Sequence, residues 1–297
     1  MSDLVTIRAW CQQAKPLFIC GLARSGTSML QVAFARHAEL FNIKNCRETH
    51  VFVRPRQPLV DPIHVPTKLY LCGREGLMGY RTLVQELQQQ EGTLSEDDLI
   101  SSFFWYASTA VYPGRQPLEK TPGHLKKLPL IFKLFPNASV VVCSRDPLDV
   151  MSSYRKRLVK SREEGMDESA LKWLDKSAPE MLAVFRRFTK LVDAARPEHG
   201  NRMFMAPYEW LVDSPAESLR RVCEFVNIPF DVRMLTKSDD EVPDPDDDYP
   251  SRYENISSQI SKRESDAHKV LSAEEIELIS EGTKPWIEAW RTPGVLG

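Results

Sequence analysis

The loop at residues 21–28 contains the residue types and the spacing of an anion-binding site. It reads Gly-Leu-Ala-Arg-Ser-Gly-Thr-Ser and lies between an apolar run, 16–20, and a predicted helix, 27–37. Glycines let backbone amides turn toward an anion, and the start of a helix favours negative charge. A strand-to-helix turn that binds nothing is the alternative interpretation. The residues that we expect to bind the anion are Ala23, Arg24, Ser25, Gly26, Thr27 and Ser28.

This loop differs from the phosphate loop of nucleoside triphosphatases at the residue that carries the positive charge. That motif has the pattern G-x-x-x-x-G-K-[ST], whereas Thr27 stands at the lysine position here and Arg24 is the cation. The strand predicted at 138–143 is followed by Arg145 and only then by Asp146, which we expect to support the turn. Since arginine binds phosphate through two parallel donors, the pattern predicts an anion held by side chains and amides, without a metal.

The alternation of strands and helices predicts an α/β fold with a central, mostly parallel sheet flanked by helices. Apolar and β-branched runs predict strands at 16–20, 40–46, 138–143 and 202–206. Apolar periodicity and capping residues predict helices at 27–37, 94–112, 147–162, 168–195, 215–226 and 273–290. Ligands of such folds bind at the carboxyl ends of the strands, which is where the loop and Arg145 lie. We expect one domain over residues 1–297.

The composition excludes several classes of protein. The 297 residues are 42% hydrophobic and 27% charged with a net charge of −2, which is typical of a globular chain and not of a disordered, collagen-like or multi-pass membrane protein. The balanced charge argues against a nucleic-acid partner. No apolar stretch is long enough for a signal peptide or a membrane span, so we expect a cytoplasmic protein. The cysteines form no C-x-x-C pair, and we expect Cys20 and Cys143 to be buried and reduced.

Three segments, in this order, resemble the sulfotransferases that use 3′-phosphoadenosine 5′-phosphosulfate (PAPS). Ala-Arg-Ser-Gly-Thr-Ser at 23–28 resembles the loop that binds the 5′-phosphosulfate. Arg-Asp-Pro-Leu-Asp-Val-Met-Ser-Ser-Tyr at 145–154 resembles the segment that binds the 3′-phosphate. Tyr-Glu-Trp-Leu-Val at 208–212 resembles an element that precedes a late helix. The resemblance spans about residues 16–230 and implies a P-loop-like fold with PAPS as the sulfuryl donor and no metal.

The resemblance also implies which side chains bind the nucleotide. Arg145 and Ser153 match the two anchors of the 3′-phosphate, and Arg157 matches an arginine just beyond them. Tyr208 is expected to contact the cofactor. Many members close a basic C-terminal segment over the 3′-phosphate, and Lys262 is the residue we assign to that role.

A further stretch resembles the tyrosylprotein sulfotransferase branch. Residues 46–54, Cys-Arg-Glu-Thr-His-Val-Phe-Val-Arg, match its Glu-Thr-Arg-Val-Ile-Pro-Arg stretch, with Glu48 on the catalytic acid/base and Arg54 on the second arginine. His50 replaces the first arginine on the acceptor side, so tyrosine specificity does not carry over with the motif. Lys120, in Glu-Lys-Thr-Pro, matches a lysine that contacts the leaving group.

Sulfuryl transfer needs a base for the acceptor hydroxyl and positive charge at the oxygen from which sulfur departs. Glu48 is the first candidate for the base and His50 the second, while Arg24 and Lys120 are the candidate cations. A surface ion pair between Glu48 and Arg54 is the structural alternative. We predict in-line transfer to a hydroxyl, or with less support an amine, of a small molecule, a natural product or a carbohydrate.

Other functions remain open at this stage. O-sulfation of peptide tyrosine is possible through the Glu48 element, whereas Thr27 argues against a P-loop kinase or NTPase. Glu48 and Lys120 argue against a nucleotide-binding module without activity. The acidic stretch 238–250 is expected to be an exposed loop beside the acceptor entrance, opposite in charge to 115–162, where basic residues outnumber acidic ones by eleven to three. The number of subunits stays undetermined.

Overall fold

Strand β1 (Leu17–Gly21) is buried on both faces, which explains its continuous apolar sequence. Leu17 and Ile19 belong to one hydrophobic cluster, and Phe18 and Cys20 to the other. This alternation is what a period of two residues requires of a strand inside a layered fold. The computed structural model describes residues 3–42, 48–56, 59, 74–236, 260 and 265–297.

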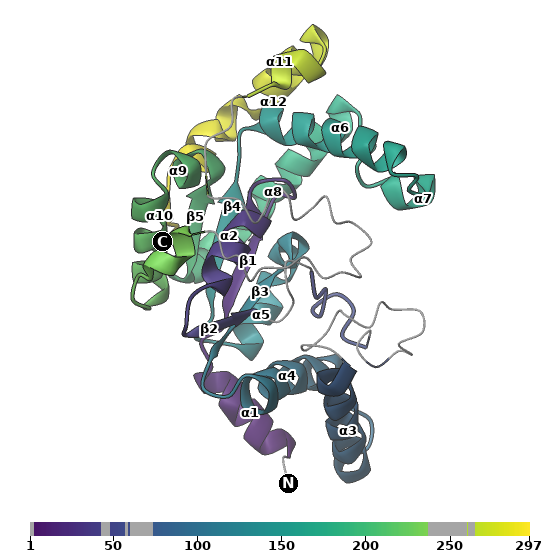
Figure 1. The fold of residues 1–297 in the computed structure, drawn as a ribbon, viewed down its shortest axis with the longest axis vertical. Coiled ribbons are helices and arrows are strands. Elements are labelled where there is room, and N and C mark those ends of the chain that lie inside the picture. The colour runs from purple at the N-terminus through teal and green to yellow at the C-terminus, as the bar shows by residue number, and fades with distance from the viewer. Residues whose placement is uncertain (1–2, 43–47, 57–58, 60–73, 237–259, 261–264) are drawn as a thin grey trace.

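The sheet has the strand order β2-β3-β1-β4-β5-β6 in the described part of the chain (Figure 1). The pairs from β2 to β5 are parallel, and β6 runs antiparallel to β5. The bounds of the other strands are β2 (Leu40–Asn42), β3 (Gln116–Lys120), β4 (Ser139–Ser144), β5 (Met203–Pro207) and β6 (Gly294–Val295). The predicted α/β fold with a mostly parallel sheet is therefore confirmed.

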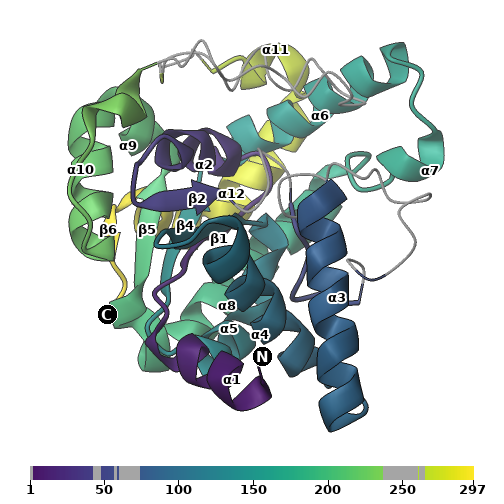
Figure 2. The same ribbon diagram turned by 60° about the horizontal axis from the view of Figure 1, so that its bottom comes forward.

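Helices cover both faces of the sheet (Figure 2). One face packs against α2 (Thr27–Ala35), α9 (Tyr208–Asp213) and α10 (Pro215–Val226). The opposite face packs against α1 (Leu4–Gln13), α4 (Glu96–Tyr106), α5 (Leu128–Leu134), α6 (Pro147–Glu163), α8 (Ala178–His199) and α12 (Ala273–Arg291). The remaining helices are α3 (Arg74–Glu91), α7 (Glu168–Leu171) and α11 (Ala267–Val270). No helix among the described residues combines the length and apolar character needed to cross a membrane.

Most predicted elements are confirmed, with small differences at their ends. The prediction at 215–226 coincides with α10, and the one at 94–112 is confirmed as α4 followed by a π-helical turn, Ala107–Val111. Ser95 caps α4 as predicted, since its hydroxyl accepts from the Asp98 amide. Of the strand predicted at 40–46, β2 covers the first part, and residues 43–46 lie outside the described residues. The acidic stretch 238–250 also lies outside them.

The prediction of a single helix at 168–195 is wrong, because this range contains two separate helices, α7 and α8. The amide and hydroxyl of Ser177 both donate to Glu180, and Pro179 occupies the first turn of α8. These are the features of a helix start, so the periodic pattern runs across a boundary. Sequence patterns also missed α1 and β3, and β3 proves central to the site.

Gly21 at the end of β1 is held against the neighbouring strand. Its φ is +135°, and a Cβ built there would lie 2.2 Å from the Cys143 carbonyl oxygen. We expect Gly21→Ala to lower the free energy of unfolding by roughly 3 kcal/mol, because overpacking and backbone strain act together. Urea denaturation measures this loss. Gly123→Ala is the control, since nothing lies within 4 Å of a Cβ there; an equal loss in both variants would contradict the explanation.

Candidate active site

The predicted site residues gather at the carboxyl ends of four adjacent strands. Arg24 lies in the loop after β1, and Lys120 is the last residue of β3. Arg145 directly follows β4, and Tyr208 directly follows β5. Because β1 lies between β3 and β4, its loop occupies the point where the strand order changes direction. That point is where ligands of open parallel sheets bind.

The loop between β1 and α2 has the backbone of an anion-binding turn. Arg24 and Gly26 have φ values of +71° and +88°, and Gly26 caps α2. The Ser25 hydroxyl oxygen lies 2.6 Å from the Leu22 carbonyl oxygen and 3.1 Å from that of Cys143. This hydroxyl fastens the loop to the sheet, and the Ser25 amide donates to the Leu22 carbonyl oxygen at 3.4 Å. Thr27 is buried in the first turn of α2, and Ala23 and Ser28 are partly exposed.

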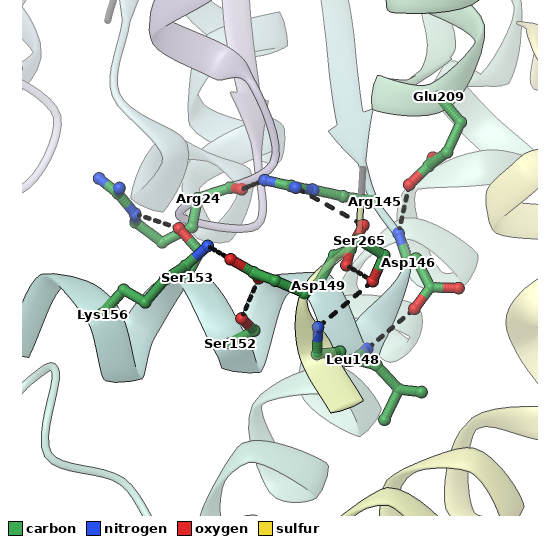
Figure 3. A network of polar contacts seen from close by, with 12 residues as sticks. Arg24, Arg145, Asp146, Leu148, Asp149, Ser152, Ser153, Lys156, Glu209 and Ser265 are labelled. Carbon is green, nitrogen blue, oxygen red and sulfur yellow. Dashed lines mark hydrogen bonds and ion pairs between the residues drawn. The ribbon is translucent and has the colours of Figure 1, made fainter. Parts of the chain in front are cut away.

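Arg24 connects Arg145 to a serine of α6, because its side chain contacts Ser153 and its carbonyl oxygen contacts Arg145 (Figure 3). Arg24 Nε donates to Ser153 Oγ at 3.0 Å, and Arg145 Nη1 lies 3.4 Å from the Arg24 carbonyl oxygen. Arg145 Nε is buried and has no hydrogen-bond partner among the described residues. A buried guanidinium nitrogen without a partner is costly unless an anion takes it up. The two arginines and Ser153 are therefore the candidate anion site.

Tyr208 joins the β5 loop to this anion site. The guanidinium carbon of Arg145 lies 4.2 Å from the centre of the Tyr208 ring, which is a cation–π distance. The ring also packs on Gly26 of the loop after β1, because a Cβ on Gly26 would lie 2.8 Å from Tyr208 Cδ2. Tyr208 thus fixes the loop and one arginine relative to each other.

The turn that carries Arg145 is tied down by acids and by the last helix. The Asp146 amide donates to Glu209 Oε1 at 2.8 Å, and burial raises the pKa of Glu209. Asp146 caps α6 through the Leu148 amide and pairs with Arg291 at 2.7 Å, which confirms its predicted supporting role. The Ser144 hydroxyl donates to the Trp290 carbonyl oxygen, so α12 is bonded to the end of β4.

Sequence reasoning missed an acidic group beside the anion site. Asp149 lies 3.5 Å from Arg145 and also accepts from the Ser265 hydroxyl (Figure 3). Asp266 accepts from the Ser152 hydroxyl at 2.9 Å and from Lys156 at 2.6 Å. The four-residue spacing of Arg145, just before α6, and Asp149, in its first turn, is a signal that could have found the first pair. No local sequence pattern predicts the contacts that Ser265 and Asp266 make with α6, because these contacts join residues more than 100 positions apart in the chain.

A second group of charged side chains lies at the end of β3. Lys120 Nζ lies 3.6 Å from Glu48 Oε1, and His50 Nε2 lies 3.4 Å from Glu48 Oε2. The Lys120 side chain is only 3% exposed, whereas that of Glu48 is 37% exposed. Glu48 therefore balances a buried cation and still reaches solvent, where an acceptor would approach. The structure brings together Glu48, His50 and Lys120, with the carboxylate between the imidazole and the ammonium group.

The two groups are neighbours. Burial raises the pKa of Tyr154 to about 12, while the charge of Arg24 lowers it and that of Glu48 raises it. Lys120 ends β3 and the loop with Arg24 follows β1, which pairs with β3, so the two groups lie at the ends of neighbouring strands. Arg157 lies one turn after Ser153 on α6. Its side chain is buried, and its Nη2 atom lies 3.4 Å from Glu164 Oε2. Lys262 lies outside the described residues.

Beneath this second group is a fully buried carboxylate, Glu119. Its Oε1 accepts from the hydroxyls of Thr49 at 2.8 Å and Thr121 at 2.7 Å, and its Oε2 pairs with His124 Nδ1 at 2.8 Å. Burial would raise the pKa of Glu119, but the charge of His124 and these hydrogen bonds outweigh burial and hold it at about 2. Glu119 is therefore ionised at neutral pH, and its stabilising contribution is lost only as the pH falls toward 2.

The described residues contain no group of three or more His, Cys, Asp or Glu side chains placed to hold a metal ion. Cys20 and Cys143 are buried and free, as predicted. Chemically, the site combines the guanidinium groups of Arg24 and Arg145 and the hydroxyl of Ser153 with the carboxylate–lysine pair of Glu48 and Lys120. Such a pair can accept a proton and meet developing negative charge within a few ångströms.

Comparison with known proteins identifies the family and the fold. The family model described as "Sulfotransferase family" matches residues 16–232. Solved structures with the same fold include the sulfotransferase domain of the curacin biosynthetic pathway, with a TM-score of 0.55 and 20% identity over 91% of this chain and 98% of that one. The sulfotransferase domain of the Synechococcus PCC 7002 olefin synthase gives 0.54 and 20% over 90% and 95%. STF9 from Mycobacterium avium gives 0.52 and 13% over 96% and 81%.

One curated relative also matches. It is an uncharacterized protein of Aquifex aeolicus, 22% identical over 229 residues, which are 74% of this chain and 26% of that protein. The chain thus spans about a quarter of the length of this relative. The structural neighbours show the P-loop-like fold that the sheet order and the loop after β1 already indicate.

Proposed function

The chain belongs to the sulfotransferase family, and we propose that it moves the sulfuryl group of PAPS to a hydroxyl of a small-molecule, natural-product or carbohydrate acceptor. The observation that carries the proposal is the convergence of Arg24, Arg145 and Ser153 beside the pair formed by Glu48 and Lys120. An anion site alone would suit many ligands, but an anion site bordered by a carboxylate–lysine pair suits group transfer.

PAPS fits the residues at the anion site. Its 3′-phosphate would be bound by Arg145, whose buried Nε has no protein partner among the described residues, and by Ser153. Its 5′-phosphosulfate would be bound by the amides of the loop and by Arg24. When bound, PAPS supplies a sulfuryl group attached to a phosphate oxygen that becomes more negative as the bond to sulfur breaks.

The residues of this chain divide the remaining work. Glu48 accepts the proton of the acceptor hydroxyl through one of its carboxylate oxygens. Its side chain is half-exposed, so that an acceptor can approach it from solvent. Lys120 and Arg24 supply positive charge at the oxygen that sulfur leaves. His50 contacts the second oxygen of Glu48 and orients it. Thr27 replaces the lysine of a triphosphate loop, so a kinase-like reaction is the weaker alternative.

Nucleotide binding tests the donor assignment directly. We expect 3′-phosphoadenosine 5′-phosphate (PAP) to bind at least tenfold more tightly than ATP with Mg²⁺, because the site offers a second anion position at Arg145 and no lysine at residue 27. Isothermal titration calorimetry of the wild-type chain with each nucleotide measures the ratio. Tighter binding of ATP with Mg²⁺ would overturn the proposal in favour of a kinase or NTPase.

The acceptor class is then found with sulfur-labelled PAPS. A panel of phenols, aliphatic alcohols, sugars, amines and a tyrosine-containing peptide separates the proposed acceptors from tyrosine O-sulfation of a peptide. Tight PAP binding with no product from any member of the panel would instead favour a nucleotide-binding module without activity.

A further inference from the structure

The segment that carries Glu48 has no regular secondary structure of its own. Residues 48–50 belong to no helix or strand, and they follow residues that lie outside the described part of the chain. A base must nevertheless be held to within a fraction of an ångström of its working position. Something other than backbone pairing in a sheet must therefore fix Glu48.

Three consecutive residues at the end of β3 contact three consecutive residues of this segment. Glu119 accepts from both the hydroxyl and the amide of Thr49, at 2.8 and 3.4 Å. Lys120 pairs with Glu48 at 3.6 Å. Thr121 Oγ1 accepts from the His50 amide at 3.5 Å. The segment is thus docked on the strand through side chains, residue against residue.

A single buried carboxylate is the centre of this docking. One oxygen of Glu119 receives the hydroxyls of Thr49 and Thr121, the direct neighbours of Glu48 and Lys120. The other oxygen is fixed by His124, and Phe52 packs edge-on against the His124 ring with centroids 5.0 Å apart. Both Glu119 and His124 have side chains that are 0% exposed. Hydrogen bonds in such a dry environment resist displacement, because the buried groups have no water to replace them.

We propose that Thr49, Glu119 and His124 form a positioning device that sets the distance between the base Glu48 and the cation Lys120. The carboxylate of Glu119 couples the loop to the strand, and His124 holds the carboxylate. Thr49 is the link on the loop side, since its hydroxyl donates to Glu119 and accepts from the Val51 amide at 3.3 Å. The catalytic consequence rests on the proposed function, but the docking of residues 48–51 does not.

Thr49 is the position at which to test this device. Removing Glu119 or His124 leaves a buried charge without its partner and endangers the fold. Thr49→Val keeps the shape of the side chain and removes only the hydroxyl, and Thr49→Ser restores it. Thr283→Val is the matched control, because Thr283 is equally buried, donates to the Ile279 carbonyl oxygen and lies in α12.

Hydrogen–deuterium exchange of the peptide covering 48–53 is the first measurement. We expect Thr49→Val to speed exchange there by about tenfold, with Thr49→Ser and Thr283→Val close to the wild type. The second measurement is steady-state transfer from labelled PAPS to the best acceptor of the panel. We expect kcat of Thr49→Val to fall about tenfold, with KM for PAPS unchanged within about twofold and kcat recovered in Thr49→Ser.

The two measurements separate this inference from the proposed function. Unchanged exchange at 48–53 in Thr49→Val overturns the positioning device, whatever the activity. Faster exchange with unchanged kcat shows docking without the effect on catalysis and overturns the proposal as stated. If the wild type transfers no sulfate, the proposed function fails, and the exchange result alone still decides whether Thr49 docks the segment.

Discussion

Replacing Glu48 by Gln is expected to lower kcat for sulfuryl transfer by about 10²–10⁴-fold, which is the range over which a positioned base accelerates proton transfer. The amide keeps the size of the side chain and can still contact Lys120 and His50, but it cannot accept the proton. Affinity for PAP should change by less than about threefold, because Glu48 lies beside Lys120 and not at Arg145 or Ser153. Labelled-sulfate transfer and calorimetry on the same preparation measure both.

Glu91→Gln provides a control for this substitution, since Glu91 is exposed at the end of α3. If Glu48→Gln keeps the wild-type rate within about threefold, Glu48 is not the base. His50→Gln then becomes the decisive variant, because His50 is the second candidate for the base and contacts this carboxylate. If only His50→Gln lowers kcat, the imidazole of His50, and not Glu48, is the group that accepts the proton of the acceptor hydroxyl.

Replacing Arg145 by Ala is expected to weaken PAP binding by about 100-fold, or about 2.7 kcal/mol, as for loss of a charge-assisted contact to phosphate. The loss is large for a second reason: Asp149, which pairs with Arg145 at 3.5 Å, would then face the phosphate without its counter-charge. Calorimetric titration with PAP measures the effect, and Arg145→Lys should recover part of it because one cation remains.

Arg155→Ala is the matched control for Arg145→Ala. It removes the same charge next to the same helix, but Arg155 pairs with Glu275 of α12. If Arg145→Ala and the wild type bind PAP with equal affinity, Arg145 does not bind the 3′-phosphate and the assignment of this site is contradicted. Equal losses in the two arginine variants would show that general charge, and not the position of Arg145, governs binding.

The parts of the site that local sequence predicts are those in which a strand, a turn and a helix follow one another. The glycines and Arg24 lie between β1 and α2, and Arg145 lies between β4 and α6, so each motif contains its own scaffold. Strand β3 escaped prediction because Gln-Pro-Leu-Glu-Lys is polar at its end, although Glu119 and Lys120 are buried. Their burial is tolerated only through partners at 48–49 and 124, and no pattern of period two or 3.6 reports such partners.

The relation between the two halves of the site was equally beyond local patterns. Glu48 and Lys120 were both predicted from the resemblance, but their 3.6 Å contact follows from the docking of a segment without secondary structure onto β3. Thr49 and Glu119 are 70 residues apart in the chain. Their pairing depends on the parallel crossover that places β3 beside β2, the strand that precedes Thr49, which is a property of topology and not of spacing.

The bonds from α12 to the end of β4 have a consequence for the order in which the chain is made. All matched motifs lie within 16–232, yet the turn that carries Arg145 is bonded to Trp290 and Arg291. During synthesis from the N-terminus, the part of the site around Arg145 stays incomplete until α12 has been translated and has docked. A nascent chain that stops near residue 232 would therefore contain every recognisable motif without holding Ser144 and Asp146 in place.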